Sequence, residues 1–142
     1  MFFNSTPKYF AQKLPDWDGL IKNEKIQFVH FFATWCKPCM QELPVFDTLR
    51  KIYSSEKIEF TFVCLDLKNS KKLGKQMSIF NLPGRVFYLE PTEKSIQSMN
   101  SNWNGTLPAS ILYELNSSRN QLIEGSKNVS FYRNFIENEI HY

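Results

Sequence analysis

Continuous apolar runs along the chain predict the strands of a buried sheet. The segments "IQFVHFFA" (26–33) and "IEFTFVCLDL" (58–67) lack helical spacing and are rich in Phe and β-branched residues, which is typical of central, parallel strands. "RVFYL" (85–89) predicts a further short strand. "ASILYEL" (109–115) and "NQLIEG" (120–125) flank the turn-like stretch "NSSRN" and predict a hairpin.

Segments between these strands have the spacing of amphipathic helices. After the first strand, apolar residues recur every three or four positions, at Leu43, Phe46, Leu49, Ile52 and Tyr53. Further helices are predicted over 70–80, over 91–103 with its start at Pro91, and over 129–140. The order β-α-β-α-β-α-β-β-α predicts an α/β fold, a central mixed β-sheet flanked by helices on both faces.

Size and composition fit one packed domain. The chain has 142 residues, of which 42% are hydrophobic, with a net charge of +3. That charge is too small and too scattered to indicate nucleic-acid binding. No apolar run reaches the roughly 18 residues that span a membrane. The first residues, "MFFNSTPKYFAQ", do not resemble a signal peptide, so we expect either a cytosolic protein or a mature form whose leader has been removed.

Two cysteines stand two residues apart in "FFATWCKPCMQELP" (31–44), directly after the first strand. A structural zinc site needs four ligands, whereas this pair is joined only by a distant Cys64 and two widely separated histidines. A purely structural disulfide closing so short a loop would restrain the unfolded chain little. Redox chemistry therefore explains the pair better than either alternative.

The predicted position of the pair favours a reactive thiolate. Cys36 lies near the start of a helix, where unpaired N–H groups and the helix dipole favour an anion, and Lys37 adds a nearby positive charge. Pro38 suits the first helical turn. We expect Cys36 to attack a substrate disulfide and Cys39 to resolve the resulting mixed disulfide.

The motif resembles the thioredoxin superfamily, and within it the TlpA/ResA branch of extracytoplasmic thiol–disulfide oxidoreductases. The pattern W-C-x-P-C-x-x-E-x-P of that branch is matched by Trp35, Cys36, Pro38, Cys39, Glu42 and Pro44. "GTLPASILYEL" (105–115) resembles the superfamily's cis-proline loop, with one extra residue between Gly and Pro and with Ala109 in place of Thr. The resemblance begins near Asp16. It implies a single thioredoxin-like domain over 1–142, with 1–15 as an N-terminal extension.

The resemblance implies roles for residues around the cysteines. Glu42 is expected to lie near them and to tune their acidity. His30 stands six residues before Cys36, where thioredoxins carry a buried Asp. It is interpreted either as a core histidine or as part of a proton relay. Cys64 is expected to be a small core residue.

Substrate contact is expected from residues on both sides of the pair. A cis bond at Pro108 would expose the backbone of Leu107 to an extended substrate strand. The residues expected to bind substrate are Trp35, Lys37, Pro38, Leu107 and Pro108.

The sequence thus predicts a thiol–disulfide oxidoreductase that acts on protein substrates through the Cys36–Cys39 disulfide, with no organic cofactor and no metal. The expected partners are those substrates and an upstream electron donor, and the protein is expected to be a monomer. By resemblance it is a reductant in an extracytoplasmic compartment, as in cytochrome c maturation, and is held near a membrane by a leader or anchor absent from this chain. The alternative location is the cytoplasm.

Two other functions are alternatives for a chain with this pattern. Peroxiredoxins share the fold but carry Thr three residues before the reactive cysteine, where this chain has Ala33. A non-enzymatic module that holds thiol-bearing clients or a soft metal such as Cu(I) is the remaining alternative.

Overall fold

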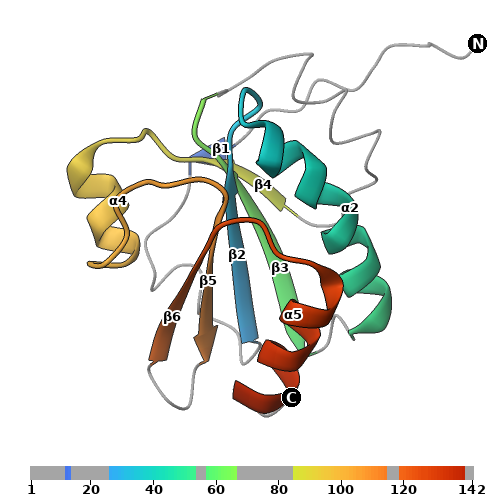
Figure 1. Ribbon diagram of the computed structural model, residues 1–142. Coiled ribbons are helices and arrows are strands. Elements are labelled where there is room, and N and C mark those ends of the chain that lie inside the picture. The colour runs from blue at the N-terminus through green and yellow to red at the C-terminus, as the bar shows by residue number, and fades with distance from the viewer. Residues whose placement is uncertain (1–11, 14–25, 54–56, 67–84, 115–118, 140–142) are drawn as a thin grey trace, which may run out of the picture.

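The computed structural model describes residues 12–13, 26–53, 57–66, 85–114 and 119–139 (Figure 1). Six strands form one mixed sheet in the order β1-β4-β3-β2-β5-β6. β1, β4, β3 and β2 are mutually parallel where they pair, while β5 is antiparallel to both β2 and β6. The strands are β1 (Gln12–Lys13), β2 (Ile26–Phe32), β3 (Ile58–Cys64), β4 (Arg85–Tyr88), β5 (Ala109–Glu114) and β6 (Arg119–Glu124).

Helices cover both faces of this sheet. α2 (Lys37–Ile52) and α5 (Val129–Asn134) lie on one face, and α4 (Glu93–Met99) lies on the other (Figure 1). α5 continues as a π-helical turn over Phe135–Glu139. The predicted α/β class, a mixed sheet between helices on both faces, is confirmed.

The central strand β2 divides the core into two layers because its side chains alternate between the faces. Phe28 and Phe32 belong to the cluster packed under α2 and α5. Val29 and Phe31 belong to the cluster on the α4 side. His30 follows the first set: its ring centroid lies 4.1 Å from that of Phe46, on α2. A polar side chain is therefore placed inside the layer that also contains the two cysteines.

The helix predicted over 91–103 is shorter than expected. Thr92 is its N-cap, and Thr92 and Ser95 form a reciprocal capping box. The helix ends at Met99, so Trp103 lies in the following loop, fully buried, with its indole N–H donating to the carbonyl of Thr106 at 2.9 Å. The prediction was wrong at this end because the burial of Trp103 comes from a folded-back loop, which mimics helical spacing in the sequence.

The remaining elements agree with the sequence prediction where the structure describes them. The final helix, predicted over 129–140, is present as α5 and its π-helical extension. β1, inside the segment 1–15, was not predicted; it pairs with β4 at the edge of the sheet. The helix predicted over 70–80 and the centre of the hairpin turn, 115–118, lie outside the described residues.

Candidate redox site at the start of α2

Cys36 and Cys39 form a disulfide at the N-terminus of α2, with their Cα atoms 5.2 Å apart. Cys36 is the N-cap residue: its sulfur accepts a hydrogen bond from the backbone N–H of Cys39 at 3.3 Å, and its carbonyl accepts the N–H of Met40. Pro38 occupies the first helical turn, where no N–H donor is required. The sulfur of Cys36 therefore lies where the helix favours negative charge.

The two sulfurs differ in their access to solvent. Cys39 is completely buried and Cys36 retains 4% of its surface, while Trp35, Lys37 and Pro38 around them are exposed. Trp35 is 71% exposed although it is a large apolar side chain. An approaching molecule would thus meet Trp35 and Cys36 before Cys39.

Glu42, one turn after Cys39, points into the core. Both residues belong to the buried face of α2. One carboxylate oxygen of Glu42, Oε2, accepts hydrogen bonds from the Tyr132 hydroxyl at 2.8 Å and from the backbone N–H of Lys127. Burial raises the pKa of Glu42, and these hydrogen bonds only partly oppose the effect. The structure does not place it on the solvated face that its residue type alone would suggest.

His30 reaches the same carboxyl group from β2. Its Nδ1 lies 2.8 Å from the Ser110 hydroxyl on β5, and its Nε2 lies 3.5 Å from Oε1 of Glu42. Burial lowers the pKa of His30 to about 3, so the imidazole is neutral near pH 7. His30 packs against Phe46 of the core cluster that includes both cysteines, and Glu42 shares the buried face of α2 with Cys39. The roles predicted for His30 and Glu42 stay predictions.

The loop before β5 lies beside the redox pair. β5 pairs with β2 up to Ala109 and Phe31, and the same register continued brings Leu107 and Pro108 alongside the segment that leads to Cys36. Leu107 packs against the cluster that includes both cysteines. The Leu107–Pro108 peptide bond is cis in the structure. Pairing of this backbone with a substrate strand stays a prediction.

Sequence reasoning missed a polar anchor under the loop that carries the motif. Asp66 accepts hydrogen bonds from the backbone N–H and the hydroxyl of Thr34, at 3.0 and 2.6 Å, and from the thiol of Cys64 at 3.0 Å. Burial alone would raise the pKa of Asp66, but these hydrogen bonds outweigh it and hold the pKa below its usual range. A signal existed: β2 and β3 are parallel, so Thr34 and Asp66 follow strands that end at the same edge of the sheet.

Ser110 and Tyr132 were also missed. Each could have been found as a hydroxyl-bearing residue within an otherwise apolar strand or helix stripe, because a buried hydroxyl needs a partner. Both are buried here and surround the His30–Glu42 pair.

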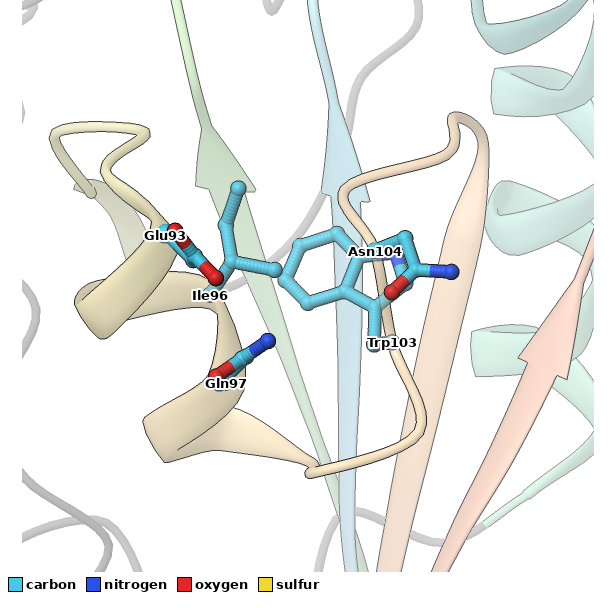
Figure 2. Close-up of a pocket in the computed structure, with 5 residues that line it drawn as sticks. All are labelled: Glu93, Ile96, Gln97, Trp103 and Asn104. Carbon is cyan, nitrogen blue, oxygen red and sulfur yellow. The ribbon is translucent and has the colours of Figure 1, made fainter.

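Other features of the described residues lie outside this site. A pocket of about 380 Å³ lies between α4 and the loop that follows it, lined by Glu93, Ile96, Gln97, Trp103 and Asn104 (Figure 2).

Across the described ranges, no group of three or more His, Cys, Asp or Glu side chains could hold a metal ion. No helix in this part of the chain is long and apolar enough to cross a bilayer.

Comparison with known proteins identifies thiol–disulfide oxidoreductases and thioredoxins or thioredoxin-like proteins as relatives. ResA, a thiol–disulfide oxidoreductase of Geobacillus kaustophilus, is 28% identical over 122 residues, 84% of this chain and 63% of ResA. The thioredoxin-like protein YneN of Bacillus subtilis is 36% identical over 59 residues, 42% of this chain and 32% of YneN. The thioredoxin of Mycoplasmoides gallisepticum is 28% identical over 71 residues, 50% of this chain and 67% of that protein. The chain thus spans about a third of YneN and less than two thirds of ResA.

Solved structures share the fold. A thioredoxin-related protein of Neisseria meningitidis superposes with a TM-score of 0.69 at 18% identity, covering 81% of this chain and 84% of its own. A thiol:disulfide interchange protein of Chlorobium tepidum superposes with a TM-score of 0.68 at 20% identity, covering 92% of each chain. The sequence model of the Thioredoxin family matches residues 8–114, which include β1 to β5 and the cysteine pair, and the chain therefore belongs to the thioredoxin family.

Proposed function

We propose that this protein is a thiol–disulfide oxidoreductase that exchanges disulfides with protein substrates through Cys36 and Cys39. One observation carries the proposal: the sulfur of Cys36 caps the N-terminus of α2 and is disulfide-bonded to Cys39 in the first turn. A helix N-terminus stabilises a thiolate, which is the species that attacks a disulfide.

The reaction proceeds by two exchanges. The thiolate of Cys36 attacks one sulfur of a substrate disulfide; a mixed disulfide forms and the other substrate sulfur leaves as a thiolate. The thiolate of Cys39 then attacks the sulfur of Cys36, the Cys36–Cys39 disulfide forms, and the substrate leaves with both of its sulfurs reduced. A thiol-bearing electron donor returns the pair to the dithiol. No organic cofactor or metal takes part in these steps.

Glu42 is the proposed proton acceptor for the second exchange. Cys39 is completely buried, so its thiol proton cannot pass directly to bulk water. Glu42 lies one turn further along the same buried helix face. A carboxylate there is a general base within the protein interior.

We assign the chain to the TlpA/ResA-like branch and infer a reductant that works outside the cytoplasm. The support is the match at Glu42 and Pro44 and the ResA relatives. The thioredoxins among its relatives favour the alternative location, the cytoplasm. Under the proposal the exposed residues Trp35, Lys37 and Pro38, together with the backbone of Leu107 before Pro108, receive an extended segment of the substrate.

Exchange assays with cysteine variants test this function. The reduced protein should accelerate reduction of a model protein disulfide, and Cys36→Ser should abolish the effect. Cys39→Ser should accumulate a mixed disulfide on non-reducing gels, because attack persists without resolution. The matched control is Cys64→Ala, which removes the other cysteine of the chain and should keep exchange intact. Full activity of Cys36→Ser would contradict the assignment.

A metal titration separates exchange from the alternative of a soft-metal module. Cu(I) is added to the reduced protein and exchange is assayed in parallel. We expect exchange without metal. Tight Cu(I) binding combined with no exchange activity would favour the binding module instead.

A further inference from the structure

Two buried polar atoms face each other beneath the redox pair without a hydrogen bond between them. Nε2 of His30 lies 3.5 Å from Oε1 of Glu42, and both side chains are shielded from water. Among the described residues neither atom has another hydrogen-bond partner. Buried polar atoms are nearly always paired, and a single proton on either atom would turn this contact into a hydrogen bond.

The surrounding hydrogen bonds restrict where that proton can lie. Oε2 of Glu42 already accepts from Tyr132 and from the backbone of Lys127, so Oε1 is the oxygen left to carry a proton. Nδ1 of His30 faces the Ser110 hydroxyl, which can donate or accept. Two arrangements therefore satisfy every atom. A protonated Glu42 requires the Nδ1–H tautomer of His30, and an ionised Glu42 requires the Nε2–H tautomer.

We propose that His30 is a positioning residue for Glu42 that changes tautomer with the redox state of the cysteines. In the disulfide form, Nε2 of His30 accepts a hydrogen bond from the protonated carboxyl group. In the dithiol form, Nε2–H donates to the carboxylate. This inference rests on the proposed exchange function, because it assigns Glu42 as the acceptor of the Cys39 proton.

The proton count closes over one catalytic cycle. When the mixed disulfide is resolved, the Cys39 thiol proton passes to Glu42; the Cys39–Cys36 bond forms and the bond from Cys36 to the substrate breaks, its electron pair leaving on the substrate thiolate. When a thiol donor delivers two electrons, Cys39 leaves as a thiolate and takes the proton back from Glu42. His30 carries one N–H throughout and stays neutral.

The groups around the pair favour neutral forms. Burial lowers the pKa of His30 to about 3 and raises that of Glu42. Tyr132 on α5 keeps its proton, because burial and the neighbouring Glu42 raise its pKa. Lys127 and Ser126, before α5, lower the pKa of Glu42 and so make its ionised form easier to populate. Ser110 on β5 completes the set by pairing with His30.

NMR of the histidine ring nitrogens tests the tautomer directly. The native protein, labelled with ¹⁵N, is studied at pH 7 as the disulfide and after reduction with dithiothreitol, and the His30 signals are assigned by their loss in His30→Asn. We expect Nδ1–H in the disulfide form and Nε2–H in the dithiol form. One unchanged tautomer, or an imidazolium, would overturn the inference.

Infrared spectroscopy gives a second, independent reading. The disulfide form should show the carbonyl band of a buried carboxylic acid at pH 7, and this band should be lost both on reduction and in Glu42→Gln. A carboxylate spectrum for Glu42 in both redox states would overturn the inference. Neither spectroscopic test needs an active protein. Exchange with one fixed tautomer would defeat this inference alone, whereas a tautomer switch without exchange would defeat the proposed function alone.

Matched substitutions separate positioning from packing. The amide of His30→Gln can occupy the place of Nε2 and face Glu42, while the shorter His30→Asn can reach only Ser110. We expect single-turnover resolution to slow about tenfold or more in the Asn variant, within the range of general-base effects, with a shifted pH profile that the Gln variant restores. Equal losses in both variants at every pH would indicate packing alone and overturn the inference.

Discussion

Glu42 opposes the helix terminus in setting the acidity of the cysteines. The N-terminus of α2 favours a thiolate, by an amount worth roughly 0.3–1 kcal/mol where exposed. A buried negative charge within about 4–6 Å can raise a thiol pKa by about a unit or more. Because Glu42 and Cys39 share the buried face of α2, the carboxylate acts mainly on Cys39, which is the thiol that must lose its proton inside the protein.

Replacing Glu42 with Gln should therefore have two opposite effects. The pKa of the Cys39 thiol should fall by about one unit because the neighbouring negative charge is removed. Resolution of the mixed disulfide should nevertheless slow, by on the order of a hundredfold, because the proton acceptor is lost. Thiolate absorbance against pH and single-turnover kinetics measure the two quantities separately. If neither changes, Glu42 is a structural residue only.

Asp66 should stabilise the loop that carries the cysteines through its charge. The folded-state pKa of Asp66 is depressed, so its contribution is present above the unfolded pKa, about 3.9, and is lost as pH falls through the folded pKa. Asp66→Asn should lower the free energy of unfolding by about 1 kcal/mol at pH 7, and the difference from the native protein should be smaller at about pH 3, below the unfolded pKa. Urea titrations at both pH values measure this.

Asp47→Asn is the matched control for Asp66. Asp47 pairs on the surface of α2 with Arg50 and Lys51, and exposed pairs of this kind contribute only a few tenths of a kcal/mol. Equal effects of the two substitutions would contradict a special role for Asp66.

At the residue scale, the sequence revealed chemistry that is local in the chain and missed chemistry that is not. Cys36, Cys39 and Glu42 follow one another at intervals of three residues, about one helical turn each, so spacing alone relates them. Ser110 and Tyr132 reach the same cluster from β5 and α5. Their partners lie 80 and 90 residues away, and no local pattern encodes such a pairing.

The elements of the fold were predictable wherever a continuous hydrophobic pattern coincided with one regular element. β2 and β3 are almost completely buried on both faces, and α2 has a single buried stripe. The pattern failed at α4, where Trp103 extends the apolar spacing beyond the helix. The turn at Gly105 brings the chain close to Ile96, and its positive φ of 86° is a backbone conformation that favours glycine.

The start of α4 should depend on its capping box. Thr92→Ala removes the hydroxyl that accepts the N–H of Ser95 and should lower the free energy of unfolding by about 1 kcal/mol. Ser98→Ala, within the same helix, should change it by less than about 0.5 kcal/mol. Exchange activity should be unchanged in both, because α4 lies on the face opposite α2. Denaturant unfolding and the exchange assay check the two statements, and a loss of activity in Thr92→Ala would show that the two faces are coupled.

At the scale of the whole molecule, burying His30 and Glu42 together links global stability to pH. Burial favours the neutral form of each group, so it lowers the pKa of His30 and raises the pKa of Glu42. The pKa of His30 falls from 6.5 to about 3 on folding, so the unfolded chain binds an extra proton between those values. The raised pKa of Glu42 has the reverse effect, because the folded protein then binds the extra proton above pH 4.5.

The stability of the disulfide form should therefore change little between pH 7 and pH 5, because the proton that the folded protein holds at Glu42 offsets the proton that the unfolded chain takes up at His30. Over this interval the unfolded chain protonates at His30 while the folded protein does not, and at 1.36 kcal/mol per pKa unit this alone costs about 2 kcal/mol. His30→Asn removes the term of the imidazole and leaves that of Glu42, so the free energy of unfolding should rise on acidification in this range. Glu42→Gln should instead show the full fall of about 2 kcal/mol on acidification, because it removes the group whose proton uptake on folding offsets the proton release of His30. Urea unfolding of the three proteins at pH 5, 6 and 7 measures these slopes; a native slope in His30→Asn would mean that the imidazole titrates in the folded state as it does in the unfolded chain.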